Sequence, residues 1–96
     1  MADSIHSYDL AIVGAGAVGT FHAWHALKKG LKVALFERDA SPRQATVRNF
    51  GQVIPSGMAL GTWHERAVYG SRLYQEIQQK FDITVRQQGS TYLASE

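Results

Sequence analysis

The sequence predicts an α/β fold that opens with a strand, a glycine-rich turn, a helix and a second, parallel strand. Three observations support this prediction. An apolar run over residues 8–13 ends at a glycine, as expected of a strand buried in a parallel sheet. Good helix formers follow over residues 18–29. A second apolar run over residues 31–36 comes next, which completes one βαβ unit with a right-handed crossover.

The composition agrees with a folded protein of one domain at most and excludes several other classes. Of 96 residues, 45% are hydrophobic and 19% charged, values ordinary for globular proteins. The net charge of +2 is too small to indicate nucleic-acid binding, and the absence of cysteine excludes thiolate chemistry and disulfides. Without a basic N-terminal region or an apolar run of ~20 residues, we expect a soluble, cytoplasmic protein with no membrane partner.

The first predicted helix has a clear end. Lys28 and Lys29 lie in its last turn, where positive charge complements the helix dipole. Gly30 follows and can adopt the left-handed conformation that closes a helix. Residues 40–61 then predict a long ordered loop with one short helical turn, because prolines and glycines interrupt any sustained period.

Residues 62–80 predict a second, longer helix. Thr62 and Glu65 have the spacing of a capping box, and Gly70 predicts a point of close packing inside the helix. Apolar side chains recur at three- and four-residue steps, at Trp63, Ala67, Leu73, Tyr74, Ile77 and Phe81.

The end of the chain predicts a β-hairpin. Residues 83–86 and 91–94 are strand-like and flank a turn that contains Gly89. This hairpin does not continue the parallel pattern, so the sheet is incomplete within this chain. Because a two-stranded sheet leaves its edges and one face uncovered, we expect the chain to be the N-terminal piece of a larger protein, or to pair with another chain.

The turn before the first helix carries Gly14, Gly16 and Gly19, the spacing of a dinucleotide fingerprint. Gly14 would make the tight turn, Gly16 would let the backbone approach a pyrophosphate, and Gly19 would let the helix lie close to the sheet. The first helical turn, with Ala17 and Val18, presents N–H groups and a positive dipole to phosphates. We therefore expect a Rossmann-like domain with a dinucleotide bound at these five residues.

Glu37 ends the second strand, 23 residues after Gly14, close to the ~20 expected of an acid that binds ribose hydroxyls. Its charge disfavours a 2′-phosphate, and hence NADP, against NAD or FAD. Arg38 would either reverse this preference or pack its stem beside the adenine. The alternative interpretation is a plain strand-to-helix turn with a surface glutamate.

Three segments resemble the N-terminus of FAD-dependent amine oxidoreductases, the relatives of D-amino-acid oxidase, glycine oxidase and sarcosine oxidase. The segments are residues 8–16, the pair Glu37-Arg38 and residues 45–53. The string over residues 48–57 is similar to a glycine-oxidase-like branch associated with phosphonate breakdown.

The resemblance implies FAD as the cofactor and a division of the chain into two parts. Residues 1–80 would be a partial FAD-binding domain, and residues 81–96 the hairpin that leads into a missing substrate domain.

This chain departs from the family pattern at one place in the loop. Many relatives read Gly-Ala-Ser where this chain has Gln44-Ala45-Thr46.

The resemblance also implies cofactor contacts in the loop. Thr46 keeps a hydroxyl, which the resemblance places at the FAD diphosphate, and it places Arg48, Asn49 and Gly51 beside the flavin. A hydroxyl suits phosphate oxygens, and a glycine suits close approach of backbone to a ring. Without the resemblance, Arg48 and Asn49 read as ordinary solvated loop residues.

The activity implied by the resemblance is oxidation of a small-molecule amine or amino acid, with hydride transfer to flavin, an imine product and reoxidation by dioxygen. Substrate contacts would come from later sequence, so we expect no catalytic residue and no activity from the 96 residues alone.

His22 and His25 lack a third ligand, so no metal site is expected. Two alternatives stay open: a segment of an NAD-dependent dehydrogenase, and a non-catalytic nucleotide-binding or interaction module.

Overall fold

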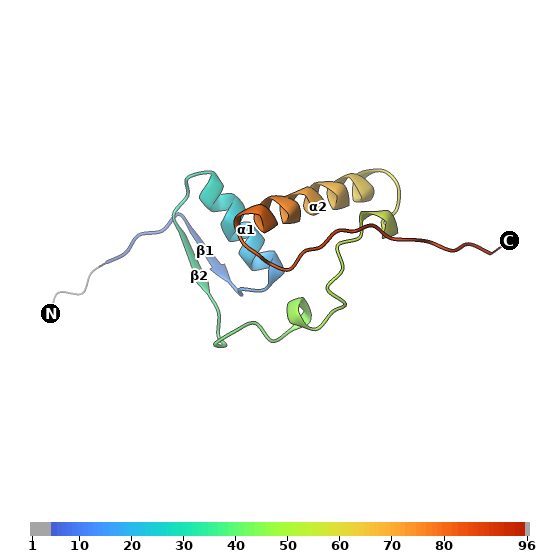
Figure 1. Ribbon diagram of the computed structural model, residues 1–96. Helices are drawn as coiled ribbons and strands as arrows, with labels where there is room; N and C mark the ends of the chain where they lie inside the picture. Colours follow the sequence, from blue (N-terminus) through green and yellow to red (C-terminus); the bar gives the residue numbers. More distant parts are fainter. Residues whose placement is uncertain (1–4, 96) are drawn as a thin grey trace. The chain divides into compact units, whose positions relative to one another are not determined.

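The computed structural model describes residues 5–95 and contains two compact units, one ending at Gly51 and the other beginning at Gln52. Residues 1–4 and 96, which fall at the ends of the predicted segments, lie outside the described residues. The elements in chain order are β1 (Leu10–Val13), α1 (Ala17–Lys28), β2 (Val33–Phe36), the 3₁₀ turns η1 (Ala45–Val47) and η2 (Pro55–Gly57), and α2 (Thr62–Lys80) (Figure 1). The predicted α/β class, the βαβ unit and the bounds of the long helix are confirmed. The loop contains two short helical turns where one was predicted.

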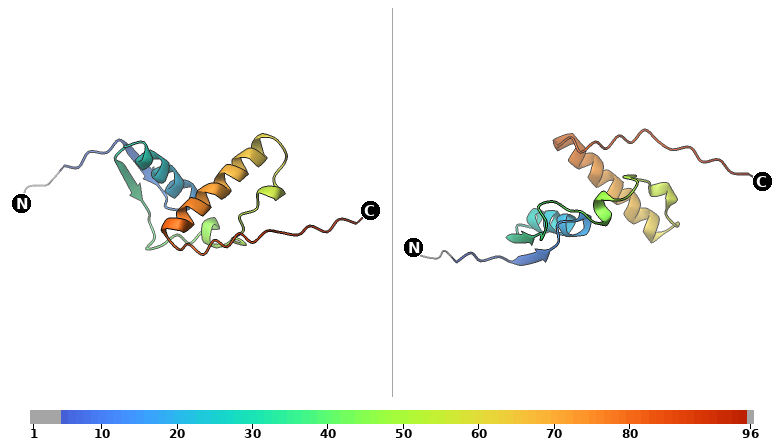
Figure 2. Two further views of the ribbon diagram at one scale, coloured as in Figure 1. Left: turned by 45° about the horizontal axis from the view of Figure 1, so that its top comes forward. Right: turned by 90° about the horizontal axis from the view of Figure 1, so that it is seen from below.

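The βαβ unit is a two-stranded parallel sheet with α1 on one face (Figures 1 and 2). The strands pair in register from Leu10 opposite Val33 to Val13 opposite Phe36. Ala23 and Ala26 of α1 are buried, and their small side chains let the helix approach the sheet closely. By contrast, Val13 is 90% and Phe36 57% exposed. The small sheet is therefore incomplete, as the strand count predicted.

The C-terminus of α1 closes as predicted at Gly30, which has a φ of +80°. The amide of Leu31 donates to the carbonyl of Ala26 at 3.1 Å, and the amide of Gly30 donates to that of Leu27 at 2.9 Å. This pair of hydrogen bonds is the Schellman motif, which satisfies carbonyls that have no partner within the helix. The chain then enters β2 directly.

Two of the fingerprint glycines have the backbone roles that the sequence predicted. Gly14 has a φ of +102°, a conformation that L side chains rarely adopt. A Cβ at position 19 would lie 1.9 Å from the Gly14 carbonyl oxygen and 3.3 Å from Ile12. Only glycine therefore allows α1 to begin so close to the end of β1.

The capping box predicted at the start of α2 is wrong. The N-cap is Gly61, with a φ of +90°, and no side chain caps the helix. Thr62 is the first helical residue, one position too late for its hydroxyl to cap. The backbone amide of Glu65 donates instead to the Gly61 carbonyl at 3.0 Å. The close packing predicted at Gly70 is also wrong, because nothing lies within 4 Å of the place a Cβ would take.

The predicted hairpin is not formed, because residues 82–95 contain no strand. Gly89 adopts the positive φ of a turn glycine, +93°, but the flanking segments do not pair. The Oε1 atom of Gln78 in α2 accepts hydrogen bonds from the amides of Ile83 and Val85, both at 3.0 Å. An isolated hairpin is marginally stable at best, and here a helix side chain takes donors that a partner strand would need.

Replacing Gly19 with Ala should destabilise the chain, because the new methyl group would lie 1.9 Å from the Gly14 carbonyl oxygen. Gly70→Ala is the matched control, since it makes the same change where nothing lies within 4 Å. The control should stabilise α2 by about 1 kcal/mol. Urea unfolding followed by circular dichroism measures both effects, and a stabilising Gly19→Ala would contradict the close approach.

Hydrogen bonds from Gln78, from the Thr84 amide and from Arg86 lower the pKa of Asp82 from 3.8 to about 2. Because the pKa is lower in the folded chain, the carboxylate stabilises the folded state at neutral pH. That contribution should be lost as the pH falls from 3.8 through about 2. The NMR shift of the Thr84 amide should therefore titrate with a midpoint near 2. The Asp82→Asn variant should lose this titration of the Thr84 amide. A midpoint at the ordinary pKa of 3.8, or the same titration in Asp82→Asn, would contradict this network.

Candidate functional site

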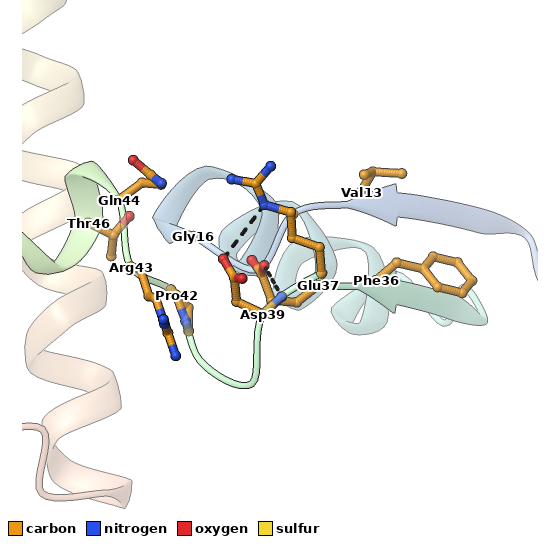
Figure 3. A pocket seen from close by; sticks show the side chains of 11 residues that line it. Val13, Gly16, Phe36, Glu37, Asp39, Pro42, Arg43, Gln44 and Thr46 are labelled. Carbon is orange, nitrogen blue, oxygen red and sulfur yellow. Dashed lines mark hydrogen bonds and ion pairs between the residues drawn. The ribbon is translucent and has the colours of Figure 1, made fainter.

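A pocket of about 360 Å³ lies at the carboxyl ends of β1 and β2 (Figure 3). In open parallel sheets, ligands bind at this edge. The pocket is formed entirely by the unit that ends at Gly51, from the glycine turn, the end of β2 and the loop that leads to η1. Its lining residues are Val13, Gly14, Gly16, Phe36, Glu37, Arg38, Asp39, Pro42, Arg43, Gln44 and Thr46.

The N-terminus of α1 borders the pocket, which Gly16 lines. The N-cap is Gly16, and the helix has no side-chain cap of the usual kind and no acidic residue in its first turn. The amide of Ala17 donates to the hydroxyl of Thr46 at 2.9 Å. The amides of Val18 and Gly19 donate no hydrogen bond to any described residue. Since first-turn amides have no partner within a helix, these two are available to an anion.

Glu37 is fixed by two backbone amides. Its Oε1 accepts from Ala15 in the glycine turn, and its Oε2 accepts from Asp39, each at 3.1 Å. The amides of Asp39 and Ala15 hold the pKa of Glu37 below its ordinary value of 4.5, so the side chain is ionised at neutral pH. Each carboxylate oxygen has a further lone pair, which allows it to accept a ligand hydroxyl.

Arg38 and Asp39 form an ion pair beside Glu37, with 3.6 Å between Nε and Oδ2. The Arg38 side chain is 80% exposed, so this pair contributes little to stability. Asp39 nevertheless adds a second negative charge at the end of β2, which opposes a 2′-phosphate there. Figure 3 shows Glu37 and Asp39 on one side of the pocket and Gln44 and Thr46 on the loop side.

Thr46 lies in η1, and its hydroxyl group is close to the glycine turn. A Cβ added at Gly16 would lie 3.1 Å from the Thr46 hydroxyl oxygen. Part of the space that the second fingerprint glycine leaves open is thus used by a side chain of the same protein. Gln44 stands where the family resemblance would place a glycine. Its φ is −98°, a value open to any residue, so this position does not require glycine.

The structure brings together some of the predicted cofactor residues but not all of them. Gly14, Gly16, Glu37, Arg38 and Thr46 line the pocket. Six other predicted residues are not among the lining residues: Ala17, Val18, Gly19, Arg48, Asn49 and Gly51. The Asn49 side chain instead bonds to its own loop, accepting from the Gly51 amide at 2.8 Å.

Six lining residues were not among the predicted site residues, although the basic side chain of Arg43 is one that the sequence leaves either facing a phosphate or solvated: Val13, Phe36, Asp39, Pro42, Arg43 and Gln44. Val13, Phe36 and Asp39 lie at or just after the ends of β1 and β2, and Pro42, Arg43 and Gln44 lie in the loop before η1. Their main signal in the sequence was their position next to predicted residues. Asp39, two residues beyond Glu37, and Arg43 also carried a chemical signal, because both are charged.

The described residues contain neither a cluster of metal ligands nor a membrane-spanning helix. Within residues 5–95, no three His, Asp or Glu side chains are placed to hold a metal ion. His22 bonds within its own helix, with 2.7 Å between its Nδ1 and the Val18 carbonyl oxygen. Among the described residues, no helix has both the length and the apolar character needed to cross a membrane.

The comparison with protein families gives one match. The family model described as DAO, FAD dependent oxidoreductase, matches residues 9–96. The matched range begins one residue before β1 and includes the pocket and α2. Neither the curated proteins nor the solved structures gave a match to the chain.

The amides of Ala15 and Asp39 should titrate together in NMR, with a midpoint below 4.5, because one carboxylate accepts from both. The stabilisation from these bonds is present above 4.5 and is lost as the pH falls through the lowered pKa of Glu37. Glu37→Gln should abolish both transitions, whereas the control Glu65→Gln should leave them unchanged. Different midpoints for the two amides would contradict the shared carboxylate.

Proposed function

The chain belongs to the FAD dependent oxidoreductase family, and we propose that its pocket at the ends of β1 and β2 holds the ADP half of FAD. One observation carries this proposal: a single pocket combines an ionised carboxylate with the N-terminus of a helix. The carboxylate is an acceptor for ribose hydroxyls, and the helix N-terminus is a donor to phosphates. The residues present therefore fit the cofactor that the family uses.

The diphosphate is assigned to the start of α1. The amides of Val18 and Gly19 have no described partner, and the positive end of the helix dipole favours an anion there. Thr46 adds a third donor. Because its oxygen already accepts from the Ala17 amide, its own hydrogen is left to donate to a phosphate oxygen.

The ribose is assigned to Glu37, which the amides of Ala15 and Asp39 hold in place. With Asp39 adjacent, two carboxylates oppose a 2′-phosphate, and Arg38 is paired with one of them. This charge pattern favours FAD or NAD over NADP, and the family match favours FAD over NAD.

The flavin end of the cofactor is assigned by the family resemblance to the loop at Arg48, Asn49 and Gly51. Gly51 has a φ of +63°, which turns the backbone sharply just after η1. We extend the proposal to the whole protein: residues 1–80 form part of an FAD-binding domain, and residues 81–96 lead toward a substrate domain.

The donor we propose is a small amine or amino acid. When bound, FAD would supply the redox chemistry: oxidation of the donor's carbon–nitrogen bond to an imine by hydride transfer, with the two electrons and two protons passing to dioxygen as hydrogen peroxide. The residues of this chain bind and orient the cofactor, and none of them is assigned to the substrate.

FAD titration of the purified protein, followed by flavin fluorescence, tests the proposal. Gly16→Val should abolish binding, because its side chain would fill the space above the turn. Glu37→Gln should weaken binding by roughly tenfold, through the loss of a charged acceptor, and the matched control Glu65→Gln should not. Unchanged FAD affinity in Gly16→Val would refute the site, and tighter binding of NAD than of FAD would favour the dehydrogenase alternative.

A further inference from the structure

The side chain of Asn49 forms hydrogen bonds with the backbone of three loop residues in and after η1. Its Nδ2 donates to the carbonyl oxygens of Ala45 and Thr46, each at 2.8 Å. Its Oδ1 accepts from the amide of Gly51, also at 2.8 Å. Both donors and one acceptor site of the amide group are therefore engaged within the loop.

The turn that Asn49 holds carries the Thr46 hydroxyl to the N-terminus of α1. That hydroxyl accepts from the Ala17 amide at 2.9 Å, and it comes so close to Gly16 that a Cβ there would lie 3.1 Å away. Contacts thus run without a break from Asn49 through η1 to the glycine turn. The hydrogen bonds within a short 3₁₀ turn have poor geometry. The side-chain hydrogen bonds from Asn49, called its brace below, therefore add to the stability of η1.

We propose that Asn49 is a positioning residue, whose hydrogen bonds to η1 hold the Thr46 hydroxyl at the N-terminus of α1. The inference rests on the proposed function, because Thr46 is one of the groups assigned to the diphosphate. It differs from the role that the family resemblance implies for Asn49, which is a place beside the flavin. In this proposal the side chain acts on the phosphate end of the site, through Thr46.

Gly51 supports this assignment. Its φ of +63° turns the chain back, so that its amide donates to the side-chain Oδ1 of Asn49, two residues earlier. Asn side chains commonly form such turns with the backbone two residues on. The glycine beside the predicted flavin site is thus also part of the brace that fixes Thr46.

The test is hydrogen exchange at the Ala17 amide, followed by NMR on the ligand-free protein. Thr46→Val removes the acceptor, and Asn49→Ala removes its brace. Each should speed exchange at Ala17 by roughly three- to tenfold, the size of one hydrogen bond's net contribution. Because both act through the same bond, the double variant should exchange no faster than the single ones. Thr46→Ser, which keeps the hydroxyl, should retain most of the protection.

Matched controls come from the other unit. Gln88→Ala deletes a carboxamide together with one extra methylene, and Thr91→Val replaces a hydroxyl with a methyl group. Both should leave exchange at Ala17 unchanged. The Leu31 amide, which closes the far end of α1, reports whether the helix stays folded. Unchanged exchange at Ala17 in Asn49→Ala, additive effects in the double variant, or equal loss of protection at Leu31 would each overturn the proposal.

ADP affinity separates this inference from the proposed function. Asn49→Ala should weaken ADP binding, Thr46→Val should weaken it at least as much, and the double variant should weaken it no more than Thr46→Val. If ADP fails to bind the unmodified protein, the proposed function fails, while the exchange experiment still decides the role of Asn49. If ADP binds equally well to Asn49→Ala and to the unmodified protein, the positioning role is overturned and the proposed function stands.

Discussion

The contact between Gly19 and the carbonyl of Gly14 determines where the rest of the site lies. A side chain at position 19 would meet that oxygen at 1.9 Å, so only glycine lets α1 start directly above the end of β1. The first-turn amides then face the carboxyl edge of the sheet. Because β2 pairs in parallel with β1, its own end reaches the same edge and brings Glu37 within hydrogen-bonding distance of the turn.

The site that results has two electrostatic sides. The start of α1 is a positive pole made of backbone N–H groups, and the end of β2 carries the carboxylates of Glu37 and Asp39. A ligand suited to both sides needs an anionic part and a part rich in hydroxyl groups, separated by a few bonds. The adenosine diphosphate portion of FAD has this pattern, and a simple phosphate or a neutral sugar has only half of it. The charge pattern and the family match therefore lead to the same ligand.

Local patterns in the sequence predicted the βαβ unit, the end of α1 at Gly30 and the bounds of α2, because each depends on neighbouring residues or on a short repeat. The wrong predictions come from side-chain hydrogen bonds that no local pattern records, or from a shift of one residue. The capping box failed because Gly61 turns the chain one residue before Thr62. The hairpin failed because Gln78 takes the amides of Ile83 and Val85. The hydrogen bond between the Ala17 amide and the Thr46 hydroxyl joins residues 29 apart, and no pattern in the sequence predicts it.

Mapping ADP binding onto the backbone amides by NMR tests the central claim most directly. If the pocket holds the ADP half of the cofactor, the largest shift changes should fall on residues 14–19, on residues 37–39 and on Thr46. Amides of α2 should serve as the unperturbed reference. Changes centred on α2, or spread evenly over the chain, would contradict the assignment of the dinucleotide to the edge of the parallel sheet.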